Sequence, residues 1–234
     1  MVLLGALVNG ICIIAGAAIG LFFTNIPERY KETVMHGIGL AVILIGMQMA
    51  FSSENIVIVL LSLLTGAIIG EAAHLEEKLN NFGYWIESKF TTKGETSVAQ
   101  GFITASLVFV IGAMAVIGGL DSGLRGDHEV LITKAFIDGF VALVLTTTMG
   151  IGVIFSVIPV VLYEGGIALL STQIDRWIPQ AFLDGFIVEM TATGGLLIVA
   201  IGLNLLKLIN IRVANLLPAL VTVGIIYYIY GLIV

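Results

Sequence analysis

The chain has little charge, little proline and almost no cysteine. Of its 234 residues only 11% are charged while 59% are hydrophobic, and the mean hydropathy is +1.11. A soluble domain typically carries about 25% charged residues, so this scarcity of charge excludes a soluble fold of ordinary composition. Lipid is the solvent that suits so much apolar surface, and the lipid bilayer is therefore the first partner we expect.

Several function classes are excluded by other absences. A lone cysteine, Cys12, rules out an intramolecular disulfide and any cysteine-rich metal site. The formal net charge of −6, without a basic cluster, argues against a nucleic-acid partner. The sequence contains no HExxH pair, P-loop, dinucleotide-binding glycine motif or nucleophile motif. We therefore expect no enzyme activity, no catalytic residues, no bound metal and no cofactor.

Long apolar runs fill most of the chain. Windows of about 20 apolar residues, each long enough to cross a bilayer core of about 30 Å, recur from end to end. The runs are continuous rather than alternating, which favours membrane helices over a β-barrel. We predict an all-α, polytopic transmembrane helical bundle that forms a single transmembrane domain over residues 1–234. Its eight spans are predicted at about 3–23, 35–52, 55–72, 99–120, 135–153, 155–172, 186–206 and 212–232.

Residues 130–172 form one apolar stretch of about 40 residues, which we divide into two spans. We place the division near Gly150, Gly152 and Pro159. Because proline removes a hydrogen-bond donor and kinks a helix, one broken helix is the alternative.

The distribution of basic residues predicts the orientation. Lys and Arg collect in cytoplasmic loops. With both termini outside, the basic residues on the cytoplasmic side are Arg29, Lys31, Lys78, Lys89, Lys93, Lys207 and Arg212, and those on the outer side are Arg125, Lys134 and Arg176. Seven against three predicts that the N-terminus and the C-terminus both lie outside.

The inside loop at 73–97 carries apolar residues at three- and four-residue steps with charges between them. This spacing predicts an amphipathic helix over about 73–90 that lies along the cytoplasmic interface. A regulatory or partner-binding helix is the alternative.

A seven-residue phrase occurs twice, as Ala-Phe-Ile-Asp-Gly-Phe-Val at 135–141 and Ala-Phe-Leu-Asp-Gly-Phe-Ile at 181–187. A looser copy, Ala-Leu-Val-Asn-Gly-Ile, stands at 6–11. In the predicted topology all three copies lie at the outer ends of inward-running helices, which predicts internal repeats. A weaker likeness relates 39–48 to 195–204, two spans of opposite direction. Inverted repeats of that kind are common in secondary transporters.

Four carboxylates lie in or beside the apolar runs: Asp138, Asp184, Glu164 and Glu189. A charged side chain at mid-bilayer costs about 2.5–3.5 kcal/mol on insertion scales, so it usually faces protein or water and tends to mark function. Glu164 stands between Pro159 and a glycine pair, a pattern typical of a broken helix whose freed backbone groups line a cavity. A protonated glutamate bonded to a neighbouring helix is the alternative for Glu164.

The other polar positions also have two interpretations. Glu189 and Thr193 share a helix face at i, i+4 spacing, which predicts a cation or proton site. Asp138 and Asp184 would shape an outward vestibule. As an alternative, the two aspartates are caps at the heads of their helices.

Four stretches and two shorter matches carry a resemblance to a known family. They are Ile-Gly-Ala-Met-Ala-Val-Ile-Gly-Gly at 111–119, Gly-Leu-Arg-Gly-Asp at 123–127, Leu-Ile-Thr-Lys-Ala-Phe-Ile-Asp-Gly at 131–139, Ile-Pro-Val-Val-Leu-Tyr-Glu-Gly-Gly at 158–166, Gly5 with Asn9-Gly10, and Asn-Leu-Leu-Pro-Ala-Leu at 215–220. Over essentially its full length the chain resembles the bacterial integral membrane family catalogued as "domain of unknown function 554". The resemblance implies a multi-pass protein of the bacterial cytoplasmic membrane with an expected role in transport. It implies no substrate and no catalytic residues.

These features favour a secondary transporter of a small solute or ion. Its predicted substrate or ion pathway contains Glu164, Glu189, Thr193, Asp138, Asp184 and Asn9. An oligomeric passive channel is the first alternative, because the small-residue face of Gly16 and Gly20 would support a homo-oligomer. A membrane scaffold or sensor that acts through residues 73–97 is the second.

Overall fold

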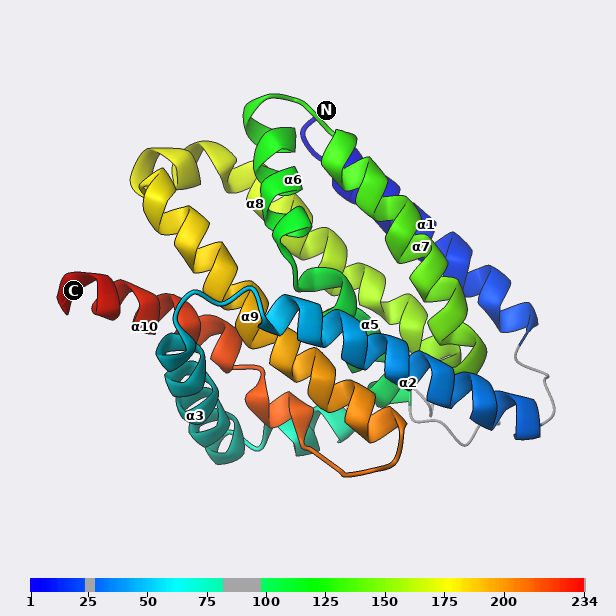
Figure 1. Ribbon diagram of the computed structural model, residues 1–234. Helices are drawn as coiled ribbons and strands as arrows, with labels where there is room; N and C mark the ends of the chain where they lie inside the picture. Colours follow the sequence, from blue (N-terminus) through cyan, green and yellow to red (C-terminus); the bar gives the residue numbers. More distant parts are fainter. Residues whose placement is uncertain (24–27, 82–97, 234) are drawn as a thin grey trace. The chain divides into compact units, whose positions relative to one another are not determined.

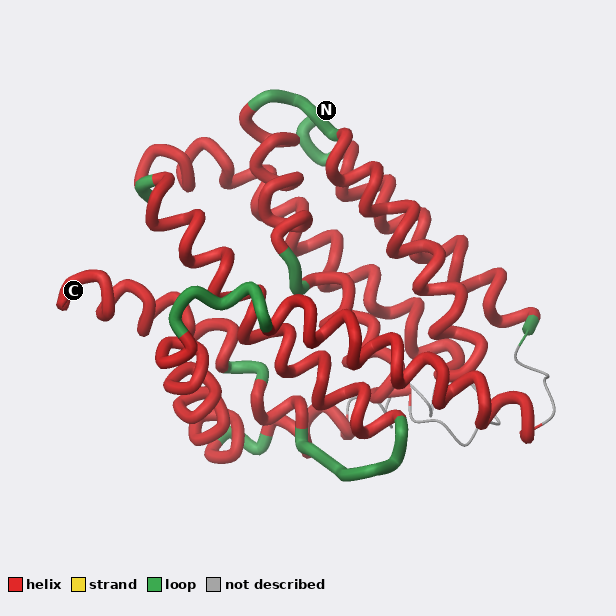
Figure 2. The backbone as a smooth tube through the Cα atoms, in the orientation of Figure 1, coloured by secondary structure: helices red, strands yellow, loops and turns green. Residues whose placement is uncertain are grey.

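A computed structural model describes residues 1–23, 28–81 and 98–233 of the chain. Within these ranges every regular element is a helix (Figures 1 and 2). The elements are α1 (Leu4–Phe22), α2 (Glu28–Ala50), α3 (Ile56–Ala72), a short helix Leu75–Asn81, α5 (Val98–Val110), α6 (Ala113–Leu124), α7 (Glu129–Met149), the 3₁₀ segment η1 (Gly150–Ser156), α8 (Val157–Trp177), α9 (Gln180–Leu205), η2 (Val213–Leu216) and α10 (Ala219–Ile233).

The helices have the length and apolarity of membrane spans. Four helical stretches of the described chain can each cross a bilayer, and the number rises to six if each of two bent pairs counts as one span. The prediction of an all-α fold with several candidate membrane spans is therefore confirmed for the described residues. The count of eight spans stays a prediction.

The chain forms two compact groups of helices. Unit 1 comprises Met1–Val34 and Gly83–Pro179, and unit 2 comprises Met35–Phe82 and Gln180–Val234. Unit 1 thus contains α1 and α5 to α8, whereas unit 2 contains α3, α9, α10 and most of α2. The chain enters each unit twice. That both units belong to a single transmembrane domain remains a prediction.

In unit 1, α1 lies along α7 in a close parallel pair (Figure 1). Gly5 packs against Leu131 near the start of both helices, and Gly20 packs against Leu143 further along. A Cβ added at Gly20 would lie only 2.6 Å from the Leu143 carbonyl oxygen, so the absence of a side chain permits this approach. Small residues bring membrane helices together in this way. The parallel direction agrees with the predicted topology, in which the looser copy of the phrase at 6–11 and the copy at 135–141 on α7 run in the same direction.

Helix α8 runs antiparallel to α1, because Gly10 contacts Val157 at the start of α8 while Gly165 contacts Leu3. Helices α7 and α8 are therefore separate and opposed. The chain reverses through η1, where Gly150 has a φ of 69°, a conformation that suits glycine. The helix does change at Gly150, where the division is predicted, and the assignment of α7 and α8 to two membrane spans stays a prediction.

The predicted break at Pro159 is wrong. Pro159 lies in the first turn of α8, where a missing N–H costs no intrahelical hydrogen bond. The helix continues without interruption through Glu164 and the glycine pair that follows it.

A different helix of unit 1 is broken. Helix α5 ends at Val110, and after a bend of 60° the chain continues as α6. Gly112, between them, has a φ of 147°, which a residue with a Cβ rarely adopts. The break interrupts the backbone hydrogen-bond ladder, so carbonyl groups at the end of α5 must find other donors.

In unit 2, α2 and α9 pack antiparallel through two reciprocal glycine pairs. A Cβ added at Gly46 would lie 2.7 Å from the Gly195 carbonyl oxygen. A Cβ added at Gly39 would lie 3.3 Å from the Gly202 carbonyl oxygen. These four residues are the glycines of the weaker sequence likeness. The two helices do run in opposite directions, as the order of predicted spans requires. In each helix the two glycines are seven residues apart, and this spacing lets the helices pack closely on each other. Internal repeats stay a prediction.

The same unit contains a polar joint at the end of α3. After His74, whose φ is 50°, helix Leu75–Asn81 leaves α3 at 57°. The Asn215 amide donates to Glu71 Oε2 at 2.6 Å and accepts from the Glu76 backbone N–H at 2.8 Å. The first part of the predicted interfacial helix is therefore helical, and residues 82–90 lie outside the described residues.

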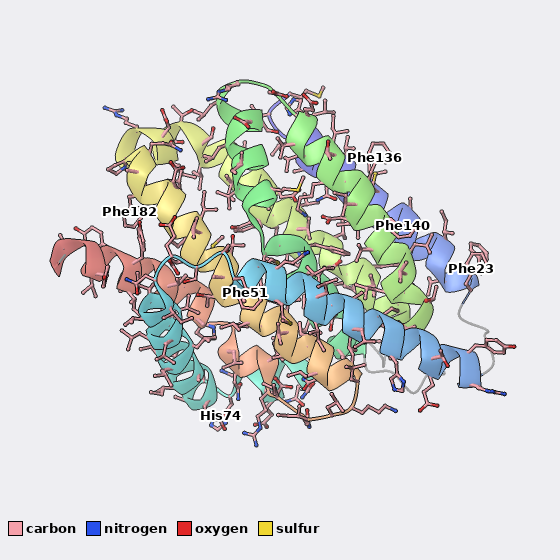
Figure 3. The ribbon with its side chains drawn as sticks, viewed as in Figure 1. Phe23, Phe51, His74, Phe136, Phe140 and Phe182 are labelled. Carbon is pink, nitrogen blue, oxygen red and sulfur yellow. The ribbon has the colours of Figure 1, made fainter. Side chains whose placement is uncertain are left out.

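Large apolar side chains on the outer faces of the helices are exposed. On α7 the two phenylalanines of the repeated phrase, Phe136 and Phe140, are 70% and 69% exposed and point away from the helices packed against α7 (Figure 3). Between them along the chain, Asp138 is buried. The phrase thus presents exposed aromatic rings on one face of the helix and a buried carboxylate on the other.

Candidate functional site

Unit 1 buries a group of four polar side chains from three helices, which we term the buried charge cluster: Asn9 of α1, Lys134 and Asp138 of α7, and Glu164 of α8. Asn9 and Glu164 are 0% exposed, Asp138 is 5% exposed and Lys134 is 6% exposed. Charged side chains are almost never buried to this extent unless they are paired. Glu164 is seven residues into α8, about 10 Å from its start at 1.5 Å per residue, so the cluster lies well inside the helical core of the unit.

The Lys134 ammonium group is the centre of the cluster. Lys134 and Asp138 are four residues apart on α7, the spacing at which side chains on one helix face meet, and they form an ion pair. The same ammonium lies 3.3 Å from Glu164 Oε1. It also donates to the Phe109 carbonyl oxygen at 2.6 Å.

The Phe109 carbonyl belongs to the last turn of α5, directly before the broken segment at Gly112. The break frees this oxygen from the helix ladder, and the lysine supplies the missing donor. A cation at a helix C-terminus is also favoured by the helix dipole. The broken helix and the charged groups therefore form one structural feature.

Asn9 bridges the two carboxylates. Its side-chain nitrogen donates to Asp138 Oδ2 at 3.0 Å and to Glu164 Oε1 at 2.8 Å. Both hydrogens of the amide nitrogen are thus used. The close parallel packing of α1 on α7 is what carries Asn9 to this position.

The cluster has more acceptors than donors. With both acids ionised, Asp138 and Glu164 contribute two negative charges and Lys134 one positive charge. Asn9 Oδ1 and Glu164 Oε2 have no hydrogen-bond partner among the protein groups that the structure describes. Burying a polar atom without a partner typically costs about 1–3 kcal/mol, and such atoms are uncommon in native proteins. The cluster is therefore short of one donor and one positive charge.

Three of the six predicted pathway residues, Asn9, Asp138 and Glu164, meet in the cluster. The capping alternative for Asp138 is wrong, because Asp138 lies nine residues into α7 and His128 is the N-cap residue. Lys134 was assigned to an outer loop, and this assignment is also wrong. The signal that could have identified it is the i, i+4 spacing between Lys134 and Asp138.

Glu189 and Thr193 lie in unit 2 and form a separate arrangement. Glu189 is 2% exposed. Its Oε1 accepts the backbone N–H groups of Glu54 and Asn55 at 2.9 and 2.8 Å, and its Oε2 accepts the Ser53 hydroxyl at 2.7 Å. Thr193 donates to the Glu189 backbone carbonyl, not to its carboxylate. Glu189 thus binds the turn between α2 and α3 at the N-terminal end of α3.

Replacing Glu189 with alanine is expected to lower the free energy of unfolding by about 3 kcal/mol, because three donors in a partly buried turn lose a charged acceptor. Thermal unfolding of the detergent-purified protein measures the loss. Glu54→Ala, an exposed acid in the same turn, is the control and should change stability by less than about 0.5 kcal/mol. An unchanged unfolding temperature for Glu189→Ala together with lost transport would return Glu189 to the pathway.

The second copy of the phrase is used differently from the first. Asp184 is exposed and accepts a hydrogen bond from Gln180 Nε2 at 2.9 Å. The ring of Phe182 stacks with that of Phe186, with 6.3 Å between ring centroids, and meets Tyr227 edge-on. The two aspartates thus differ: Asp138 contacts buried side chains of α1 and α7, whereas Asp184 is exposed and bonds a residue of its own helix. The place of Asp184 in the pathway stays a prediction.

The chain is similar to a protein family of unknown function and to two bacterial proteins, one of which is named a membrane protein. The family described as "Protein of unknown function (DUF554)" matches residues 4–228. The chain is 30% identical over 221 residues to the "Uncharacterized membrane protein YdfK" of Bacillus subtilis (strain 168), covering 92% of each chain. It is 28% identical over 222 residues to the "Uncharacterized protein YqgA" of Escherichia coli (strain K12), covering 93% of each. No solved structure matches.

Proposed function

The chain belongs to the DUF554 family, and from this premise we propose that it is a secondary transporter of a small solute or ion. The proposal is that the buried charge cluster of unit 1 forms the ion or substrate site. We assign it to the bacterial cell membrane and assign it no enzymatic activity.

The single observation that carries this proposal is the buried charge cluster beside the broken helix α5–α6. Ionisable residues inside membrane segments are costly and tend to mark ion or substrate pathways. Irregular backbone at membrane depth is tolerated where protein surrounds it or where it lines a cavity, and discontinuous helices with ion-binding ends are a recurring feature of transporters. Here the end of α5, a lysine and two carboxylates come together at one place.

The proposed orientation has both termini outside. Lys134 lies buried in α7, so it no longer counts as an outer-loop charge. The count of basic residues then becomes seven against two, because Arg125 and Arg176 remain on the outer side. This change favours the proposed orientation more strongly.

Uptake into proteoliposomes tests the proposal. Candidate solutes are first chosen from a panel of amino acids, organic acids and alkali cations by the rise in unfolding temperature that a bound ligand produces. We expect the wild-type chain to accumulate at least one of them, and Glu164→Gln to reduce uptake to the level of empty liposomes, because the amide cannot carry the charge of the acid. Asp175→Asn, an exposed acid on the same helix, is the matched control and should keep wild-type uptake.

Two results would contradict the transporter. Unitary current steps in a planar bilayer would show a passive channel, since carriers turn over too slowly to give them. Uptake that is unaffected by Glu164→Gln in a correctly folded variant would remove the buried charge cluster from the pathway. Loss of cellular function after deletion of residues 73–90, with uptake intact, would favour the scaffold or sensor instead.

A further inference from the structure

The missing component of the buried charge cluster can be identified by its chemistry. The atoms without a partner, Glu164 Oε2 and Asn9 Oδ1, are both oxygen acceptors on side chains that are 0% exposed. What the cluster lacks is therefore a donor with a positive charge. A proton, an ammonium-type solute and a metal cation are the three chemical classes that meet this description.

The surroundings of Glu164 favour the proton. A metal cation such as Ca²⁺ needs about six or more oxygen ligands, and it would lie beside the Lys134 ammonium group, which is 3.3 Å from Glu164 Oε1. Two adjacent positive charges repel each other strongly at low dielectric. An ammonium-type solute has the same difficulty. A proton needs one acceptor and forms a covalent O–H bond, so it adds no second cation next to the lysine.

We propose that Glu164 is a proton-binding site, and that the proton it takes up and releases is the coupling ion of transport. The term "coupling" rests on the function proposed above, whereas the proton site itself rests on the buried charge cluster alone. On uptake, a proton from water adds to Glu164 Oε2 and forms an O–H donor. On release, that O–H bond breaks and the proton returns to water. No other covalent bond changes.

Protonation changes the partners of Lys134. When Glu164 is ionised, the ammonium group is shared by two carboxylates. When Glu164 is neutral, Asp138 is the only carboxylate that attracts it. Because the same ammonium also binds the Phe109 carbonyl at the end of α5, a shift of Lys134 toward Asp138 is transmitted to the broken helix. The proton thus acts on the irregular segment of the unit through one lysine.

Few other titratable groups face Glu164 in the described residues. Helix α7 contributes Lys134 and Asp138. Helices α1 and α5 and the segment η1 contain no acid, base or histidine. Helix α6 contributes Asp121, whose carboxylate pairs with Arg125 at 3.1 Å on a partly exposed face. On α8 itself the neighbour is Tyr163. Proton uptake by the cluster is therefore expected on one of its two carboxylates. We assign it to Glu164 because Glu164 Oε2 has no hydrogen-bond partner among the described protein groups.

Infrared difference spectroscopy tests the proton site without any transported solute. The full chain in lipid nanodiscs is brought from alkaline to neutral and then acidic pH, and the C=O band of protonated carboxyl groups is recorded. We expect one band of a buried, slowly exchanging acid that shifts when the protein contains ¹³C-labelled glutamate. The band should disappear in Glu164→Gln, remain in Asp175→Asn and return at a shifted position in Glu164→Asp.

Each outcome decides the inference. Isotope labelling shows that the acid is a glutamate, and Glu164→Asp assigns it to this position even if Glu164→Gln fails to fold, because the band of Glu164 then loses its ¹³C-glutamate shift whereas a band of buried Glu189 would keep it. The absence of a labelled glutamate band, or a band that stays in Glu164→Gln, overturns the proton site even if solute uptake is observed. A band that responds to NaCl rather than to pH indicates a metal cation and overturns it as well. The band together with an absence of uptake for every solute supports the proton site and contradicts only the transporter.

Discussion

Replacing Lys134 with methionine is expected to lower the free energy of unfolding by about 3–5 kcal/mol, the cost of removing one partner from a buried ion pair. Methionine fills a similar volume without charge, so the loss reports the charge and not a cavity. Two buried carboxylates are then left without their cation, and the Phe109 carbonyl loses its donor. Thermal unfolding of the purified protein in detergent measures the change.

The charge balance of the cluster makes this prediction specific. Asp138→Asn leaves one acid facing one base, so it should cost much less than Lys134→Met. The double variant Lys134→Met with Asp138→Asn should recover a large part of the stability, and the difference between the sum of the single losses and the double loss measures the coupling. Lys78→Met, at an exposed lysine, is the control. Equal losses for Lys134→Met and Lys78→Met would show that Lys134 does not balance the buried acids.

Substituting Gly16 with alanine is expected to cost about 1–3 kcal/mol, the usual range for inserting a methyl group into a well-packed core. The added Cβ would collide with the Gly139 carbonyl oxygen on α7, and backbone atoms cannot turn aside as a flexible side chain can. Helix α1 must then move away from α7 and carry Asn9 with it. Uptake should fall together with stability, because the bridge between Asp138 and Glu164 is lost.

Gly166→Ala provides the matched control for this substitution. Gly166 lies on α8 of the same unit, and nothing stands within 4 Å of a Cβ added there. In a helix interior this change should stabilise the protein by about 0.5–1 kcal/mol, since alanine has less backbone freedom to lose. Unfolding temperatures of the two variants are compared in one detergent. A Gly16→Ala protein as stable as Gly166→Ala would contradict the close packing of α1 and α7.

The sequence predicted the helices because lipid imposes simple requirements on composition. Each apolar run in the described part of the chain is mainly helical, although the run at 99–120 is divided between α5 and α6 and the run at 212–232 between η2 and α10. The relative directions of α1, α7 and α8 follow from the order of spans. The pattern did not reveal the break between α5 and α6. Gly112 stands in an apolar run with other glycines, and only its backbone conformation distinguishes it from those that lie inside helices.

The candidate site could be predicted in part. Asn9, Asp138 and Glu164 were identifiable because a polar residue in an apolar run is conspicuous. Lys134 was missed because a lysine near the predicted end of a span resembles a loop residue. For Glu189, its place in an apolar run four residues before Thr193 predicted an ion site. The structure shows that its oxygens accept from a turn more than 130 positions away along the chain, a contact that no local pattern reports, and its place in the pathway stays a prediction.

The composition of the buried charge cluster has an electrical consequence. With the proton bound, one base and one ionised acid cancel, and the loaded site is neutral. Without the proton, the site carries one negative charge. A membrane potential acts on a charge by about 2.3 kcal/mol per 100 mV, so in the proposed transport cycle voltage would leave the proton-loaded form unaffected and would act on the empty form. An interior-negative potential would then drive the empty site outward, and the energy of the cell's electric field would enter the cycle in its return half.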